Sequence, residues 1–422
     1  VSGAAATAPL VWGGTGFFVK GQADPFAGID PKGKIVVIYS EGLPRGMDFQ
    51  TFRANRANVE DPITHARKAG AVGVITLTPS AAAQNWDRTR RQRETGGNFQ
   101  VDKLRVTGGN DNFPVVALSP KASDALLAGS GVDIAGLSKA YPGSDPFPTV
   151  NFTKSASLNV TASQVKSKTQ NVVAIWEGSD PKMKDEMVAV GAHYDHVGNA
   201  PEQGCRPIGN DSICNGADDD GSGTVAVLSM AEALAKAPQR PKRSVLFVWH
   251  CGEEKGLWGS EYFNKYPTVD VKKVIAQLNI DMIGRSRKAD DTDPKDKDLS
   301  GENAIYVIGK DMMSSTLGNL VSSVNSGYLK LDYDTRYDDP KDPNRFFFRS
   351  DHFNYALNGI PITFWFDGVH VDYHQVGDEP DKIDYQKMEK VTRTILTTLW
   401  ELTAIKDRPK IDKQLPTELS QR

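Results

Sequence analysis

The chain has 422 residues, too many for one ordinary hydrophobic core, so we expect two domains. Hydrophobic residues make up 39% and charged residues 24%, which is ordinary for a globular protein, and the formal net charge is only -3. This charge balance argues against a nucleic-acid-binding protein, and the sequence lacks the run of about 18 apolar residues that predicts a membrane span. The chain begins at Val1 without a signal peptide, which is typical of a processed or trimmed product.

The first part of the chain, residues 1–145, predicts a small β-rich domain. Three β-branched runs bounded by Gly or Pro are the expected strands: 34–39, 72–77 and 113–118. Residues 62–69 are expected to form a helix that ends at Gly70. A loose stretch rich in Pro, Ser and Thr follows at about 143–170. We place the domain boundary there, with the second domain covering 146–422.

Apolar runs alternate with helical segments in the second domain. The expected strands are 187–192, 244–249, 274–280 and 360–366, and the two longest expected helices cover 223–237 and 384–405. This alternation is typical of an α/β fold with a mixed, largely parallel sheet flanked by helices.

The chain has three cysteines. Cys205 and Cys214 bracket a short loop rich in turn-forming residues, and in an oxidising compartment they would form a disulfide. This pairing predicts a secreted, periplasmic or extracellular protein, and two unpaired thiols in the cytosol are the alternative. Cys251 lies in an apolar run and is expected to be an inert buried thiol.

Imidazole and carboxylate groups follow successive predicted strands of the second domain. They are His193 and Asp195, Asp218 in the loop before the first long helix, Glu253 and Glu254, Asp281, and finally His370 and His374. Each motif alone is weak, because a lone His-x-Asp is more often a surface pair and Asp-Asp-Asp-Gly is usually a turn. However, functional groups of open α/β sheets collect at the carboxyl ends of the strands. The convergence of these groups at one edge therefore predicts a site.

The mixture of residue types is the one that a two-zinc site needs. Zinc binds imidazole nitrogen and carboxylate oxygen, and two zinc ions about 3.5–4 Å apart can share a carboxylate and a water. Such a site also needs a base that is not a ligand, and the Glu253–Glu254 pair supplies one base and one ligand. Asp195 is spaced to orient His193 through its second ring nitrogen.

The ordered motifs resemble one family. His-x-Asp, Gly-Ala-Asp-Asp-Asp-Gly-Ser-Gly, Gly-Glu-Glu, Asn-Ile-Asp-Met and Tyr-His are similar to those of the zinc exopeptidases, which include double-zinc aminopeptidases, glutamate carboxypeptidases, glutaminyl cyclases and the non-catalytic transferrin receptor. The resemblance covers about residues 165–405. Residues 1–145 similarly resemble the protease-associated domain of many members, on the runs that start at Gly33 and Ala69.

The resemblance implies a zinc-dependent aminopeptidase with two zinc ions per chain and a peptide substrate. It assigns one zinc to His193 and Asp281, the other to Glu254 and His374, and the bridging position to Asp218. It also makes Glu253 the general base and Asp195 the residue that orients His193. The motif Ser350-Asp-His352 also matches the family and is expected to support the wall of the site.

Two departures from the family pattern affect these expectations. The tyrosine that often precedes the Ser-Asp-His motif is replaced here by the run 346–349, Phe-Phe-Phe-Arg, so His370 and Tyr373 become the candidates for polarising the substrate carbonyl. Members with a protease-associated domain usually begin with a segment of the catalytic domain. This chain instead starts almost directly in the protease-associated domain. We therefore expect that part of the precursor is missing or cleaved.

Other functions are compatible with parts of this pattern. A carboxypeptidase or dipeptidase would need an arginine to clamp a terminal carboxylate, and Arg285 and Arg349 lie close to the motifs. A single-zinc cyclase would not need the ligands of a second zinc ion. All five candidate ligands are present here, which argues against a cyclase. A non-catalytic binding module would be expected to have lost ligands or the base, and the sequence retains them. The sequence leaves the oligomeric state open.

Overall fold

The computed structural model describes residues 2–95, 99–104, 113–143, 145–163, 165–199 and 205–415, so Val1 lies outside the described residues. The chain forms two compact units. The first comprises Val1–Glu94 and Val106–Ser167, and the second comprises Thr95–Arg105 and Lys168–Arg422. The change of unit at Ser167 falls within the loose stretch but later than the expected 145/146 boundary. The reason is that a strand within this stretch, Ser155–Ala162, pairs with the first strand of the chain.

The first unit is built on a five-stranded sheet with the order β6-β5-β3-β1-β7. Its strands are β1 (Ser2–Trp12), β3 (Ile35–Tyr39), β5 (Gly73–Leu77), β6 (Val115–Ala117) and β7 (Ser155–Ala162). The short strands β2 (Phe18–Val19) and β4 (Val59–Glu60) pair separately. The helices are α1 (Phe49–Ala54), α2 (Pro62–Lys68), α3 (Ser80–Ala83), α4 (Trp86–Thr95), α5 (Pro120–Leu127) and α6 (Ile134–Ala140). Strand β3 is buried along its whole length, as its run of β-branched residues predicts.

The second unit is built on a seven-stranded sheet with the order β15-β14-β16-β13-β9-β12-β8. Its strands are β8 (Val172–Trp176), β9 (Met187–His193), β12 (Ser244–His250), β13 (Val274–Ile280), β14 (Ala304–Ile308), β15 (Asp332–Asp334) and β16 (Ile362–Phe366). The central strands β12, β9, β13 and β16 are parallel, whereas β8 and β14 pair antiparallel with their neighbours β12 and β16. The predicted mixed, largely parallel sheet is therefore confirmed.

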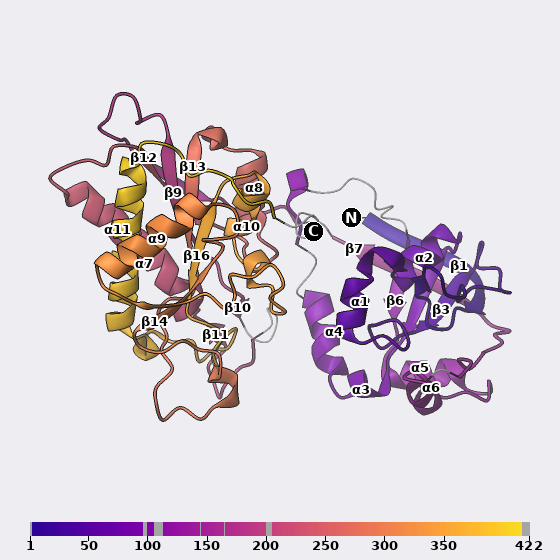
Figure 1. The fold of residues 1–422 in the computed structure, drawn as a ribbon. Coiled ribbons are helices and arrows are strands. Elements are labelled where there is room, and N and C mark those ends of the chain that lie inside the picture. The colour runs from indigo at the N-terminus through magenta and orange to yellow at the C-terminus, as the bar shows by residue number, and fades with distance from the viewer. Residues whose placement is uncertain are drawn as a thin grey trace. The chain divides into compact units, whose positions relative to one another are not determined.

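Helices cover both faces of this sheet, as Figure 1 shows. They are α7 (Gly223–Lys236), α9 (Ser315–Gly327) and α11 (Tyr385–Ala404) on one face, and α8 (Trp258–Lys265) and α10 (His352–Leu357) on the other. Strand β9 explains why both faces are covered. Its Val188 and Val190 pack among the first set of helices, whereas Met187 and Ala189 pack with the second. Because successive side chains point to opposite faces, a strand that is apolar throughout needs a layer on each side.

Arg243 holds the C-terminal end of α11 against the sheet. Its guanidinium is 2% exposed, and it donates to the carbonyl oxygens of Thr403 (3.3 Å) and Ile405 (2.5 Å). It also pairs with Glu186, at 2.8 Å. The last carbonyls of a helix have no partner within the helix, so this buried arginine satisfies groups that would otherwise be left unpaired.

We expect Arg243→Leu to lower the free energy of unfolding by about 3 kcal/mol, because each buried carbonyl left without a donor costs about 1–3 kcal/mol. Arg408→Leu is a matched control, since Arg408 also pairs with Glu186 (2.6 Å) but its side chain is 45% exposed. That variant should lose at most about 1 kcal/mol. Urea denaturation followed by circular dichroism measures both. Equal losses in the two variants would contradict this account.

The structure joins Cys205 to Cys214, which confirms the predicted disulfide. Cys214 lies in the short strand β11 (Ile213–Cys214), which pairs with β10 (Gly198–Asn199). The expectation for Cys251 is only partly met, because this cysteine directly follows β12 and is half-buried, with its Sγ 2.7 Å from Oγ1 of Thr169. Among the described residues, none of the helices has the length and apolar character needed to cross a membrane.

Candidate metal centre

The side chains predicted to form a site come from the carboxyl ends of four neighbouring parallel strands. His193 is the last residue of β9, Glu253 and Glu254 follow β12, Asp281 follows β13, and His374 lies in the loop after β16. The loop before α7 adds a run of three aspartates, Asp218, Asp219 and Asp220, all of them buried. The sheet order β16-β13-β9-β12 makes these ends adjacent, as the convergence of motifs predicts.

Two groups of potential ligands share one aspartate. The His193 group consists of His193, Asp219 and Asp281, whose ligand atoms all lie within 4.8 Å of one another. Nε2 of His193 is 3.2 Å from Oδ1 of Asp219 and 3.7 Å from Oδ2 of Asp281. The Glu254 group consists of Asp219, Glu254, His374 and His196. Nε2 of His374 is 3.1 Å from Oδ2 of Asp219 and 3.0 Å from Oε2 of Glu254.

Asp219 is the residue between the two groups, and this corrects the assignment of Asp218 to the bridge. One oxygen of Asp219 faces the His193 group and the other faces the Glu254 group. The carboxylate of Asp218 turns away. It accepts a hydrogen bond from the backbone N–H of Gly284 (2.7 Å) and lies 3.2 Å from Nε2 of His370. The sequence offers three equivalent aspartates, and the backbone of the loop decides which one faces the cluster.

The neighbours of Asp219 hold its loop in place. The carboxylate of Asp378 accepts from the backbone N–H groups of Asp218 (3.0 Å) and Asp219 (3.1 Å). Asp220 accepts from the N–H of His193 (3.0 Å) and of Gly223 (3.0 Å), and thereby ties the loop to the end of β9 and to the start of α7. A side chain at Gly223 would meet Oδ1 of Asp220 at 2.3 Å, so only glycine allows this approach.

The ring of His193 is oriented with Nε2 toward the cluster. Its Nδ1 lies 2.9 Å from the backbone oxygen of Asp195, and because a carbonyl only accepts, Nδ1 carries the proton. The lone pair is then on Nε2, where a metal ligand needs it. The Asp195 carboxylate, expected to do this orienting, lies 3.8 Å from Nδ1 and accepts instead from the backbone N–H of Glu253 (3.1 Å). Asp195 thus contacts both residues, through different atoms.

The Ser350-Asp-His352 motif lies behind the cluster. The hydroxyl of Ser350 donates to Oδ2 of Asp281 (2.6 Å) and accepts from Nδ2 of Asn279 (2.9 Å). His352 is buried, and its Nε2 lies 2.8 Å from the backbone oxygen of Phe347. Ser350 therefore positions a residue of the His193 group, and His352 belongs to the wall.

Burial and mutual charge shift the pKa values in the cluster in opposite directions. Burial raises the pKa of Glu253 well above its usual value, and the charges of Asp281, Asp351 and Glu254 add to this, although His193 opposes it. Burial also acts to raise the pKa of Asp219, but His193 and His374 outweigh it and hold this pKa well below its usual range. The pKa of His374 rises to about 9, because Asp219 and Glu254 overcome the effect of burial. Glu253 and Asp219 are therefore suited to different roles, one exchanging a proton and the other staying ionised.

A pocket of about 440 Å³ adjoins the cluster, and its lining includes Arg349, His370 and Tyr373. The ring of Tyr373 stacks on that of His374 at 3.9 Å between centroids, which links the pocket to the Glu254 group. The guanidinium of Arg349 lies over the ring of Phe346 and 3.5 Å from the hydroxyl of Tyr373. His370 is buried against Asp218 rather than directed at the cluster.

Arg285 is committed to other partners. It lies 2.8 Å from Oδ2 of Asp372 and 3.6 Å from Oδ1 of Asp378, and its side chain is 11% exposed. Arg349 is therefore the better placed of the two arginines for contacting a substrate.

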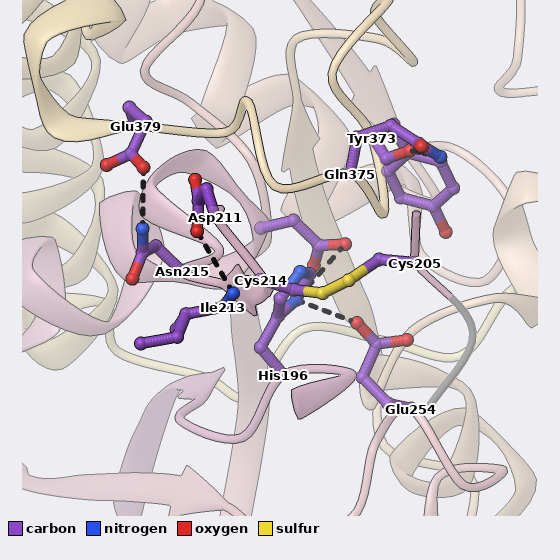
Figure 2. The surroundings of a disulfide bond; sticks show 11 residues. His196, Cys205, Asp211, Ile213, Cys214, Asn215, Glu254, Tyr373, Gln375 and Glu379 are labelled. Atoms are coloured by element: carbon purple, nitrogen blue, oxygen red, sulfur yellow. Dashed lines mark hydrogen bonds and ion pairs between the residues drawn. A yellow bond between two sulfur atoms is a disulfide. The ribbon is translucent and has the colours of Figure 1, made fainter. Parts of the chain in front are cut away.

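One residue of the cluster was missed by sequence reasoning. His196 is the third residue after His193, and its Nδ1 lies 3.0 Å from Oε1 of Glu254. Figure 2 shows it next to Glu254 and near the disulfide. The signal is present as His-Tyr-Asp-His, but the His-x-Asp motif ends at Asp195 and does not include the second histidine.

The donor set fits zinc. Buried atoms of five residues of the two groups have no hydrogen-bond partner among the described residues: Nε2 of His193, both ring nitrogens of His196, Oδ2 of Asp219, Oε1 of Glu254 and Nε2 of His374. Unpaired buried polar atoms are costly, and atoms that converge without hydrogen-bond geometry are typical of a metal site. Imidazole nitrogen and carboxylate oxygen are ligands that zinc accepts.

Comparison with known proteins agrees with this geometry. The sequence profile of Peptidase family M28 matches residues 171–399, so the chain belongs to this family. The probable leucine aminopeptidase 2 of Aspergillus oryzae is 31% identical over 216 residues, which are 51% of this chain and 37% of that protein. An aminopeptidase of Pseudomonas aeruginosa is 28% identical over 300 residues, covering 64% of this chain and 50% of that protein. The chain thus spans between about a third and a half of the length of these relatives.

The fold is also that of solved structures. The aminopeptidase from Aneurinibacillus sp. strain AM-1 superposes with a TM-score of 0.51 at 20% identity, covering 98% of this chain and 78% of that one. A zinc aminopeptidase from Bacillus subtilis superposes with a TM-score of 0.50 at 20% identity, covering 97% and 79% of the two chains.

Proposed function

We propose that this protein is a two-zinc aminopeptidase that removes the N-terminal residue from peptides. The observation that carries the proposal is the position of Asp219, whose two oxygens face two separate sets of imidazole and carboxylate ligands. In this assignment His193 and Asp281 complete one site, and Glu254 and His374 complete the other. Asp219 takes the bridging role that the sequence had assigned to Asp218.

Two zinc ions, when bound, would supply Lewis acidity and lower the pKa of the attacking water. Glu253 acts as the general base, taking a proton from the attacking water and returning one to the leaving amine. Its oxygen Oε2 lies 3.9 Å from Nε2 of His193, and burial raises its pKa toward the range in which such an exchange is efficient. Asp195 positions Glu253 by accepting from its backbone N–H and keeps the ring of His193 in place through its own carbonyl.

An aminopeptidase is favoured over a carboxypeptidase by the descriptions of the relatives. The two relatives named above are described as aminopeptidases. A carboxypeptidase needs a free guanidinium for the terminal carboxylate, and Arg285 is already paired with Asp372. Arg349, in the pocket beside Tyr373, keeps the carboxypeptidase as the alternative. In the aminopeptidase, Arg349 and Tyr373 contact the substrate from the pocket wall.

The zinc content and the substrate preference test this proposal together. We expect about two zinc ions per chain, hydrolysis of aminoacyl chromogenic substrates, and no hydrolysis of their N-acetylated counterparts, because acetylation removes the charge of the amino terminus. A zinc chelator should abolish the activity. Activity only on substrates with a free carboxyl terminus, lost in Arg349→Ala, would establish the carboxypeptidase instead. If the protein retains no metal after incubation with zinc and removal of the free zinc, the proposal that it is a zinc enzyme would be refuted.

Two further features extend the proposal. The disulfide between Cys205 and Cys214 supports a secreted or periplasmic location, because such bonds persist in oxidising compartments. We also propose that the first unit is a protease-associated domain. Its support is the strand pattern of 34–39 and 72–77, which form the parallel pair β3 and β5.

A further inference from the structure

We propose that His196 is an additional ligand of the metal held by the Glu254 group, coordinating it through Nδ1. This site would then have four protein ligands, Asp219, Glu254, His374 and His196. The inference rests on the proposed function, because it concerns one of the two proposed zinc sites. It differs from the assignment made by sequence motifs, in which each metal has three protein ligands including the shared aspartate.

The side chain of His196 is largely enclosed, and its ring nitrogens have no other partner among the described residues. Its side chain is 9% exposed, and neither ring nitrogen has a hydrogen-bond partner among the described residues. Burying both nitrogens of an imidazole unpaired is unfavourable, so a native protein is expected to provide a partner. The imidazole ring of His196 points toward the ligand cluster and not toward solvent.

The position of the ring nitrogen fits coordination. Nδ1 lies 3.0 Å from Oε1 of Glu254 and 3.8 Å from Oδ2 of Asp219, and these ligand atoms lie within 4.8 Å of one another. With zinc bonds of about 2.0–2.2 Å, neighbouring ligand atoms of a tetrahedral site are roughly 3.3 Å apart. The contact with Glu254 has the distance of a hydrogen bond but not its geometry, since Oε1 is also left without a hydrogen-bond partner. Two such atoms are better joined by a shared cation than by a proton.

The surroundings of His196 are shaped to hold the ring there. A side chain at Gly216 would meet the ring at 2.5 Å, and this glycine also has a positive φ of 61°, so glycine is required for two reasons. The ring packs edge-on against that of His374, with centroids 5.6 Å apart. The next residue, Val197, packs with Cys205 and Cys214, so the disulfide anchors the loop.

The consequence is an asymmetric pair of sites. The His193 group supplies three protein ligands and leaves positions open for water and substrate, whereas the Glu254 group supplies four. A site with four protein ligands resembles a closed, structural zinc site, and one with three resembles a catalytic site. We therefore expect the two zinc ions to differ in affinity, with the tighter one in the Glu254 group.

Two substitutions at His196 distinguish a ligand from a residue that merely orients Glu254. His196→Asp places a carboxylate oxygen near the position of Nδ1, where it can bind zinc but repels Glu254. His196→Asn places an amide there, which can donate a hydrogen bond to Glu254 but is a poor zinc ligand. In the full chain, zinc dissociation constants measured by competition with a chromogenic chelator should rise at least about tenfold for one site in the Asn variant. The Asp variant should stay closer to the wild type.

The visible absorption of the cobalt-substituted protein provides a second readout at saturating metal. We expect the spectrum of the Asn variant to change, because one site has lost a nitrogen ligand. An unchanged spectrum, or zinc affinity retained in the Asn variant and lost in the Asp variant, would overturn the proposal and make His196 a positioning residue. His65→Asn, in the first unit, controls for the loss of a partly buried imidazole and should leave zinc binding unchanged. A wild type that binds no zinc would instead refute the proposed function.

Discussion

Asp219→Asn is expected to lose zinc from both sites and to be inactive. The substitution removes the charge of the carboxylate that faces both groups and replaces one of its two oxygens by an NH2 group, so one metal loses its ligand atom and the other keeps only a neutral amide oxygen. Substituting a residue that only supports a metal ligand typically lowers the metal affinity about 10–100-fold. For a residue that is itself a ligand, we expect zinc binding to weaken by at least about 100-fold. Metal analysis of the dialysed variant and chelator competition measure this loss, and hydrolysis of an aminoacyl substrate measures the activity.

Asp218→Asn is the matched control. It is the same substitution at the adjacent position, and its remaining oxygen can still accept from the N–H of Gly284. We expect this variant to retain both zinc ions, because the Asp218 carboxylate faces His370 and not the ligand groups. Loss of zinc from the Asp218 variant and its retention in the Asp219 variant would restore the assignment made from the sequence.

Glu253→Gln should lower kcat by about 10²- to 10⁴-fold while both zinc ions remain bound. Glutamine has nearly the same shape but does not take up a proton at neutral pH, so only the base is removed. Metal content, measured on the same sample as kcat, separates a lost base from a lost metal. The affinity for a competitive inhibitor should change much less than kcat.

Glu254→Gln provides the contrast one residue further along the chain. Glu254 belongs to the ligand group with His374, so this variant should lose zinc affinity along with activity. Loss of activity with zinc retained in Glu253→Gln, and loss of zinc affinity together with activity in Glu254→Gln, would establish the separate roles of the two glutamates. If Glu253→Gln lost zinc as readily as Glu254→Gln, Glu253 would be a ligand and the base would have to be sought elsewhere.

The central parallel strands of the second unit could be predicted from local sequence patterns. The runs at 187–192, 244–249 and 274–280 became β9, β12 and β13 with ends shifted by at most one residue. Buried parallel strands are apolar along their whole length, so the pattern identifies them without knowledge of their neighbours. The strands of the first unit are harder to predict from the sequence. Its strands β1 and β7 are rich in Ala, Ser and Thr, and each is stabilised by a partner far away in the chain.

The sequence by itself determined the class of protein and the edge of the sheet that carries the site. Parallel strands place their carboxyl ends together, so the residues that follow β9, β12 and β13 had to meet. It also indicated the kind of chemistry, because the residue types that follow these strands are ones that bind zinc and exchange protons.

Only the tertiary structure decided which aspartate lies between the two ligand groups. Asp218 and Asp219 are chemically identical neighbours, and their directions depend on Gly284 and Asp378, which come from distant parts of the chain. The same holds for His196, whose ring reaches Glu254 through a pocket that Gly216 leaves open. Residue type and spacing specify which groups are available, whereas the direction of a side chain depends on contacts that form only when remote segments pack together.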